Sequence, residues 1–438
     1  MFRYYLKLGL FSIRKNPILS ALMVAAIAVG IGAYMTIINV DYVMSSNPIP
    51  HRSDVLFHVE VDSWQPNKAY YEPDHPPEQV TYMDGIALLE AGKARRQVLS
   101  YKTGRVLEPQ GEGERPFELE SRSTSADFFA MFDTPFVYGG GWDKSADDNE
   151  EYVVVISKEI NERLFGGENS VGQTLVMNGD PYRVSGVMDT WQPMPKFYDV
   201  NNGPFEEVEE VFLPLSVAIA NEFGSYGNTS CWKAPEGGWE GRLASECIWL
   251  QFWVELHSEN ERQEYLAFLE AYVETQKAVG RFPRPTNNRL NNVMEWMEYQ
   301  EVVAEDVGVL KGLSLLFLVV CLLNTIGLLL AKVTRQVGDI SLRRALGASR
   351  RDVFSQYIVE AGVIGLAGGL LGVAMTWLGL QGIKSLYGEL EFISRLVAMD
   401  WPVIFAAIVL AIIAALAAAL YPTWKASGVH PASQLKAL

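Results

Sequence analysis

The chain has 438 residues, a hydrophobic content of 49% and a formal net charge of −16. The acidic balance argues against nucleic acid as a partner. The five scattered histidines and three cysteines show no spacing typical of a metal site. The sequence contains no Walker A loop and no other short catalytic motif. We therefore expect no catalytic, cofactor or metal residues, and a protein that does not hydrolyse ATP by itself.

The N-terminal residues 1–16 are basic, and residues 16–40 contain no charged side chain. A helix needs roughly 20 apolar residues to span a bilayer, so a transmembrane helix is predicted at residues 17–41. A cleaved signal peptide also has a basic start. Its apolar part is shorter, however, and ends at a small-residue cleavage site, which this sequence lacks. We interpret the segment as a retained anchor.

Residues 42–306 are more polar and show strand and helix patterns, which predicts a large mixed α/β domain outside the membrane. Apolar patterns predict strands at 55–61, 152–157, 174–177, 182–187 and 248–256. Capping and stop signals predict helices at about 82–96, 159–165 and 258–280. Asn178-Gly179 is a strong hairpin turn signal. The helical pattern from Asn292 is expected to continue directly into the second span.

Two of the three cysteines, Cys231 and Cys247, lie in this outer segment. An oxidising outer compartment favours a disulfide between them, and two reduced thiols are the alternative. Cys321 lies within the second predicted span, where we expect a packed and unreactive thiol.

Three further uncharged runs predict spans at about 312–331, 361–383 and 401–424. Buried core helices are the alternative, but such helices rarely stay uncharged over this length. Small residues allow membrane helices to approach closely, although a generic membrane composition would also explain the glycines. These glycines are Gly30, Gly32, Gly362, Gly365, Gly368, Gly369 and Gly372. The predicted fold therefore has four transmembrane α-helices, one before the outer domain and three after it.

The loop 332–356 reads KVTRQVGDISLRRALGASRRDVFSQ and combines apolar residues with arginines. We expect a short amphipathic helix at about 339–348 along the membrane face, and Gly347 interrupts the loop midway with a helix-stop signal at Leu346-Gly347. The alternative is a loop whose arginines only fix the topology, which leaves the ordered apolar residues unexplained. The apolar residues are Ile340, Leu342, Ala345, Leu346, Val353 and Phe354.

Lys and Arg are concentrated at residues 1–16, in the loop 332–356 and after the fourth span. An even number of spans places these three segments on one side of the membrane, and the positive charge marks that side as cytoplasmic. Both termini are therefore expected in the cytoplasm, with residues 42–306 outside.

Several stretches resemble one family. LRRALGASRRDVFSQYIVEA and the glycine-rich span after it resemble the FtsX-type permease domain of ABC transporters. So do SIRKNPILSALMVAAIAVGIG in the first span and Tyr421-Pro422 near the end of the last. The stretch 125–188 resembles the periplasmic core domain of MacB-type permeases, a likeness that we expect to end near Met188. The resemblance divides the chain into a MacB-like domain at 42–306 and an FtsX-like permease domain at 307–438.

The resemblance implies a permease that works as a homo- or heterodimer in a bacterial inner membrane, with a separate cytoplasmic ABC ATPase. A membrane-fusion adaptor in the periplasm is a further candidate partner. We expect export of a peptide, antibiotic, lipid or lipoprotein, which the large outer segment favours. The alternative is a signal relay that activates an outside partner such as a cell-wall hydrolase.

The residues implied in coupling to the ATPase are Asp339, Leu342, Arg343, Arg344, Leu346 and Gly347. Where the family usually has Arg-Glu-Ile-Gly, this chain has Gly338-Asp339-Ile340-Ser341, which keeps a carboxylate but loses the arginine and the final glycine.

Overall fold

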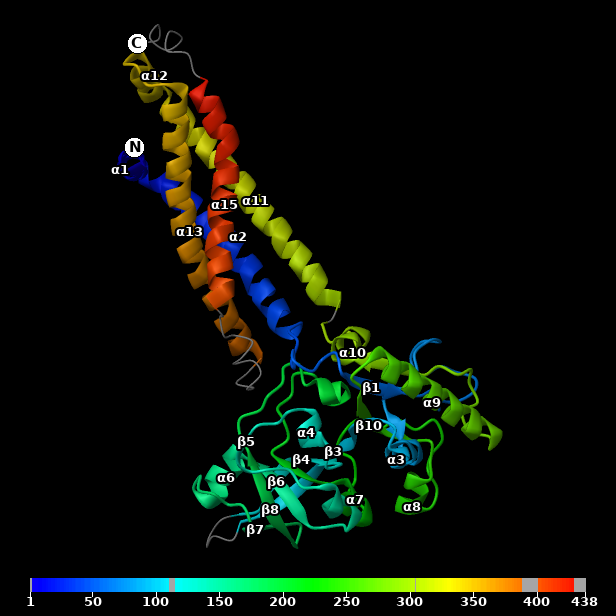
Figure 1. Cartoon of the computed structure of the whole chain (residues 1–438). Helices are drawn as coiled ribbons and strands as arrows, with labels where there is room; N and C mark the ends of the chain where they lie inside the picture. Colours follow the sequence, from blue (N-terminus) through cyan, green and yellow to red (C-terminus); the bar gives the residue numbers. More distant parts are fainter. Residues whose placement is uncertain (1, 110–114, 304, 388–400, 429–438) are drawn as a thin grey trace. The chain divides into compact units, whose positions relative to one another are not determined.

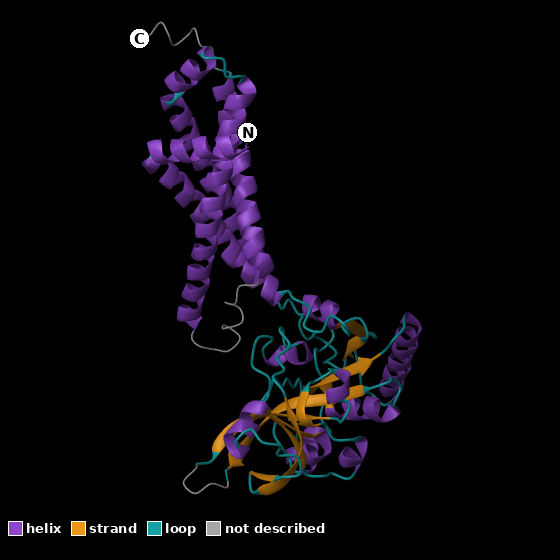
Figure 2. Ribbon diagram, turned by 60° about the vertical axis from the view of Figure 1, so that its left-hand side comes forward, coloured by secondary structure: helices purple, strands orange, loops and turns teal. Residues whose placement is uncertain are grey.

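The computed structural model describes residues 2–109, 115–303, 305–387 and 401–428. The chain divides into a membrane unit, formed by Met1–Ser45 and Val303–Leu438, and an outer domain, Ser46–Val302. Figure 2 shows that the membrane unit is helical and that the strands belong to the outer domain. Each unit has its own buried apolar core.

The described part of the membrane unit contains six helices. They are α1 (Phe2–Lys15), α2 (Pro17–Met44), α11 (Glu305–Arg335), α12 (Val337–Ala345), α13 (Arg350–Tyr387) and α15 (Trp401–Ser427). Four of them, α2, α11, α13 and α15, are long and apolar enough to cross a membrane, which confirms the predicted fold. The loop is shorter than expected, because α11 continues to Arg335 and α13 begins at Arg350. Arg335 and Arg350 at these two ends are exposed, and long charged side chains can reach water from the end of a span, so the helices extend past the uncharged runs.

Glycines allow α13 to approach α2 and α15 closely (Figure 1). A Cβ atom on Gly32 would lie 2.5 Å from Cβ of Met375, and one on Gly368 would lie 2.7 Å from the side chain of Ile27. Carbon atoms do not pack this closely, so larger residues would force the helices apart. Gly362 differs, because no described atom lies within 4 Å of its added Cβ.

The outer domain is built on a mixed sheet, which has eleven strands among the described residues. The strand order is β11-β1-β10-β3-β4-β9-β6-β8-β5, while β2 pairs with β10 and β7 pairs with β3 and β8. The pairs β4–β9 and β6–β8 are parallel, and the others are antiparallel. The strands are β1 (Leu56–Glu60), β2 (Val80–Thr81), β3 (Gln97–Glu108), β4 (Phe117–Thr124), β5 (Phe136–Gly139), β6 (Val153–Ser157), β7 (Thr174–Met177), β8 (Asp180–Met188), β9 (Val211–Pro214), β10 (Ile248–Glu255) and β11 (Arg289–Asn292).

Eight α-helices and one 3₁₀ helix accompany this sheet in the described part of the outer domain. They are α3 (Tyr82–Ala91), α4 (Phe128–Met131), α5 (Lys144–Asp148), α6 (Lys158–Phe165), α7 (Leu215–Ala220), α8 (Gly238–Leu243), α9 (Glu259–Ala278) and α10 (Val293–Tyr299), with the 3₁₀ helix η1 (Phe197–Asn202). One apolar core lies under α3 and α9 and includes Trp249 and Tyr265. A second core is strongly aromatic and joins α4, η1 and α10 around Phe128 and Trp253.

Two expectations about the outer domain differ from the structure. The helix predicted to reach residue 96 ends at Ala91, because Gly92 adopts a left-handed conformation with φ of 59°. The helical pattern from Asn292 does not continue into the second span. Helix α10 ends at Tyr299, Glu301 has a positive φ of 47°, and α11 begins only at Glu305.

Candidate functional site

The loop between α11 and α13 folds into the short helix α12. Two backbone hydrogen bonds end it, from Gly347 N to the carbonyl of Arg344 (3.2 Å) and from Ala348 N to the carbonyl of Arg343 (3.1 Å). Gly347 has φ of +104°, which a residue with a side chain rarely adopts. The helix begins at Val337 and ends at Ala345, so it is shifted toward the N-terminus from the expected 339–348.

The apolar residues of this loop do not form one face. Ile340 is buried against Val333, Val353 and Tyr357, at the facing ends of α11 and α13. Leu342 and Leu346 point the other way and are 58% and 81% exposed. One apolar side chain therefore seats α12 on the spans, while two others one helical turn apart remain on its outer surface.

The two adjacent arginines have different surroundings. Arg343 is exposed and donates a hydrogen bond to Oε1 of Gln356 in α13 (2.8 Å). Arg344 is half-buried and donates to the carbonyl of Ser427 (3.3 Å), at the C-terminal end of α15. A cation at that position also interacts favourably with the helix dipole. Arg343 is thus the more accessible of the two to a partner.

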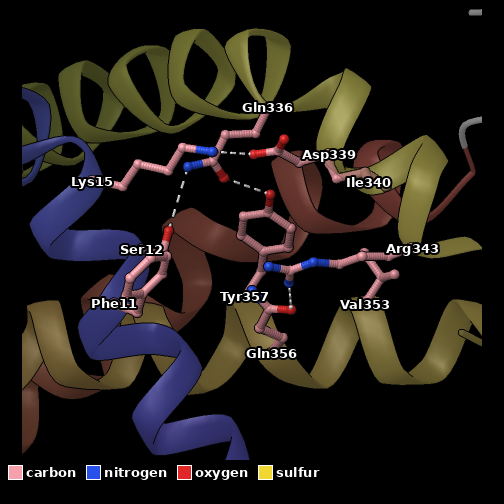
Figure 3. Close-up of a pocket in the computed structure, with 10 residues that line it drawn as sticks. All are labelled: Phe11, Ser12, Lys15, Gln336, Asp339, Ile340, Arg343, Val353, Gln356 and Tyr357. Atoms are coloured by element: carbon pink, nitrogen blue, oxygen red, sulfur yellow. Dashed lines mark hydrogen bonds and ion pairs between the residues drawn. The ribbon is translucent and has the colours of Figure 1, made fainter.

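The N-terminal helix α1 also contributes to this region, as Figure 3 shows. Lys15 forms an ion pair with Asp339 of α12. Gln336, just before α12, donates to Oγ of Ser12 (3.4 Å) and accepts a hydrogen bond from the hydroxyl of Tyr357 (2.8 Å). Sequence reasoning did not identify these partners, because their pairing depends on how the helices pack.

A small hollow lies between α1, α12 and α13, bordered by Phe11, Asp339 and Arg343 (Figure 3). Its volume is about 50 Å³. Sites for small molecules usually measure about 300–1,000 Å³, so the hollow is too small to hold a substrate.

The family comparisons cover both units. Residues 20–266 match the MacB-like periplasmic core domain, and residues 311–431 match the FtsX-like permease C-terminal domain. The chain belongs to the MacB/FtsX-like family of ABC transporter permeases. The first match continues well past Met188, where the sequence resemblance was expected to end.

Curated relatives of this permease include proteins named for export. It is 22% identical to the pyoverdine export ATP-binding/permease protein PvdT of Pseudomonas entomophila, over 82% of this chain and 49% of that protein. It is 23% identical to the macrolide export ATP-binding/permease protein MacB of Bdellovibrio bacteriovorus, over 68% of this chain and 41% of that protein. The chain thus spans about half the length of these relatives or less.

Among solved structures, the periplasmic region of MacB from Actinobacillus actinomycetemcomitans is similar to this permease. The match has 14% sequence identity and a TM-score of 0.37. It covers 58% of this chain and 95% of that chain.

The permease holds a group of charged side chains in the core of its outer domain. Arg122 of β4 is fully buried and forms ion pairs with Asp199 and with Glu209, the latter at 2.7 Å. Burial opposes ionisation of Glu209, but Arg122 and Lys196 outweigh it and hold the pKa of that carboxyl well below its usual range. Because every charge has an opposite partner, this cluster fits a structural role. Among the described residues, no group of three His, Cys, Asp or Glu side chains is placed to hold a metal ion.

A second buried pair lies between β1, β11 and α10. His58 stacks on Trp296, with ring centroids 3.7 Å apart, and its Nδ1 lies 3.7 Å from Oε1 of Glu60. Burial lowers the pKa of His58 to about 3, and burial raises the pKa of Glu60 to about 8. At neutral pH the contact therefore joins two largely uncharged groups and is not a salt bridge.

A disulfide joins Cys231 to Cys247, which are separated by 16 positions. Cys247 is buried immediately before β10, whereas Cys231 is exposed. The segment between them contains α8, and the indole of Trp239 donates to the carbonyl of Ile219 (3.0 Å). The disulfide and this hydrogen bond fasten a segment with few buried side chains of its own. Cys321 is buried in α11 as a free thiol.

Proposed function

We propose that this chain is the permease subunit of an ABC transporter and that α12 is its docking helix for a cytoplasmic ATPase. The observation that carries the proposal is the two-sided character of α12. Ile340 seats the helix on α11 and α13, while Leu342 and Leu346 remain exposed beside Arg343. Exposed leucines next to an arginine fit a partner surface that combines an apolar groove with carboxylates or carbonyls.

The proposed topology follows from the positive charge of the α12 region and of the N-terminus. With four spans, both ends and α12 lie in the cytoplasm and the outer domain lies in the periplasm of a bacterial inner membrane. This arrangement places α12 where ATP is available. A second permease copy or a paralogue completes the dimer that a dimeric ABC ATPase would engage.

Export is the function that we propose for the assembled transporter. The relatives named above are called export proteins, one for pyoverdine and one for macrolides, and the family match includes residues 46–266 of the outer domain. In the proposal, closure of the ATPase moves α12 and the spans. The outer domain then acts on a substrate on the periplasmic side, which we assign to the class of peptides, antibiotics, lipids or lipoproteins.

The test uses full-length permease co-expressed with a cytoplasmic ABC ATPase subunit from the same organism. Leu346→Asp removes an apolar contact worth about 1.5–3 kcal/mol when fully buried and places a carboxylate in the interface. We expect at least about 30-fold weaker ATPase binding, which corresponds to about 2 kcal/mol. Arg343→Glu should weaken binding as well, by placing like charges together if the groove is acidic.

A matched control is Val279→Asp, because Val279 is 71% exposed but lies in the outer domain. It makes the same kind of substitution far along the chain from α12 and should leave ATPase binding unchanged. Co-purification and permease-stimulated ATP turnover are measured for each variant. If Leu346→Asp and Arg343→Glu both retain wild-type binding and stimulated turnover, α12 is only a topology signal and the proposal is wrong.

A further inference from the structure

A cluster of polar side chains is buried beneath α12, where α1, α2, α11 and α13 meet. At its centre, Lys332 of α11 and Glu360 of α13 form an ion pair with exposures of 0% and 1%. Ser12 of α1 donates a hydrogen bond to Oε1 of Glu360 (3.1 Å), and Lys332 donates to Oγ of Ser20 in α2 (3.1 Å). The cluster therefore contains one side chain from each of four helices: the two members of the ion pair and the two serines that contact them.

Hydrogen bonds continue from this cluster to the start of α12. Ser12, which contacts Glu360, also accepts a hydrogen bond from Gln336 (3.4 Å). Gln336 is the residue immediately before the first turn of α12. The hydroxyl of Tyr357 in α13 donates a hydrogen bond to the side-chain oxygen of Gln336 (2.8 Å). Figure 3 shows Ser12, Gln336 and Tyr357 in this arrangement. The position of the pair is thus linked through side chains to the position of α12.

Stability alone gives no reason for a charged pair at this place. Removing two charges from water opposes folding, and well-packed apolar residues of similar volume often stabilise as much or more. Charged side chains within membrane-spanning helices are rare, and most of them have a functional role. In the described part of the chain, Oε2 of Glu360 has no hydrogen-bond partner, so the carboxylate is not fully satisfied. What the pair does supply is a fixed register among the helices that it joins.

We propose that Lys332 and Glu360 are positioning residues that fix the seat of α12, so that α1 and α12 move together with α11 and α13. This inference rests on the proposed function, in which α12 is the docking helix. Without the pair, α12 keeps its helix and its outer face, and the ATPase still binds. The movement of the spans, however, is no longer passed on faithfully to the ATPase.

The experiment uses the full-length permease in membranes, with and without its ATPase. Its first measurement is the rate at which an added bifunctional thiol cross-linker of about lysine length joins cysteines that replace Lys15 and Asp339, whose side chains form an ion pair. Peptide mass spectrometry reads the α1–α12 cross-link. Glu360→Gln should slow cross-linking several-fold, and the exchange variant Lys332→Glu/Glu360→Lys should restore it. A merely structural loss would instead lower the amount of folded permease and leave the cross-linking rate of the folded fraction unchanged.

The second measurement compares ATPase binding with stimulated turnover. Glu360→Gln should retain co-purification of the ATPase but reduce stimulated turnover about tenfold, and the exchange variant should recover turnover. Asp41→Asn is the matched control, because it breaks another ion pair of the membrane unit, with Lys311 (2.7 Å). It should change neither cross-linking nor turnover.

The inference is overturned if Glu360→Gln shows wild-type cross-linking and wild-type stimulated turnover. If Glu360→Gln fails to accumulate, the exchange variant decides. Restored cross-linking in the folded exchange variant supports positioning, and slow cross-linking refutes it. Failure of the wild-type permease to bind the ATPase would instead refute the proposed function, while the cross-linking measurement would still test the inference.

Discussion

Replacing Arg122 with methionine should strongly destabilise the outer domain. The guanidinium of Arg122 contacts Asp199 and Glu209, and it also donates to Oγ of Ser100 (3.1 Å). All three charged side chains are fully buried. Arg122→Met keeps an apolar chain of similar length but leaves two carboxylates with much less compensation. The effect therefore measures an uncompensated buried charge more than a lost contact.

Its magnitude follows from this burial. Breaking a buried ion pair by removing one partner typically costs about 3–5 kcal/mol. For a domain of the size of residues 46–302, each kcal/mol lowers Tm by about 2 °C, so Tm should fall by about 6–10 °C. Thermal unfolding of the detergent-solubilised permease is measured by tryptophan fluorescence. The buried Trp253, whose indole donates to the carbonyl of Tyr198 (3.3 Å), reports on this core.

A double variant, Arg122→Met with Asp199→Asn, tests the cause. It removes one orphaned carboxylate while keeping the shape of the side chain, and Glu209 keeps the buried Lys196 as its partner (3.6 Å). The remaining buried charges then cancel, so the double variant should recover much of the lost stability. A single variant that loses less than about 1 kcal/mol, or a double variant less stable than the single one, would refute this reasoning.

Three other predictions concern separate parts of the molecule. Because burial raises the pKa of Glu60 from 4.5 to about 8, its neutral form favours the folded state. Its contribution is fully present below about pH 4.5 and is lost as the pH rises through about 8, with a change on the order of 1 kcal/mol per pH unit. Denaturant unfolding at about pH 5 and about pH 8 should show a weaker pH dependence for Glu60→Gln, and an identical dependence would contradict the assignment. Mass spectrometry of unreduced peptides should find Cys231 linked to Cys247, and reduction of this loop of 16 positions should cost about 3 kcal/mol; two free thiols would rule the linkage out. Gly32→Val should destabilise the membrane unit by about 1–3 kcal/mol or more through overpacking, as read by thermal unfolding in detergent. Gly362→Val, at an open position, should have little effect, and equal losses in both variants would argue against close helix packing as the cause.

Local sequence patterns were sufficient for much of the fold. Uncharged runs longer than a bilayer crossing predicted all four spans, because hydropathy over roughly 20 residues depends on no distant contact. Strong apolar patterns also predicted β6 and β10, and Asn178-Gly179 marked the turn between β7 and β8. The hairpin of β3 and β4 was missed. The buried residues of β4 include Ser121, Arg122 and Ser123, so β4 lacks the alternation of apolar and polar residues that reveals a buried face.

The sequence by itself also indicated α12 and the residue types of its surface, since a glycine stop and a mixture of leucines and arginines are local features. Only the tertiary structure decided that Ile340 faces the spans while Leu346 faces outward. The pairing of Lys15 with Asp339 joins residues 324 positions apart, and that of Ser12 with Glu360 joins residues 348 positions apart. Such contacts depend on how whole helices pack against one another, and short-range periodicity carries no information about which polar side chains will then meet.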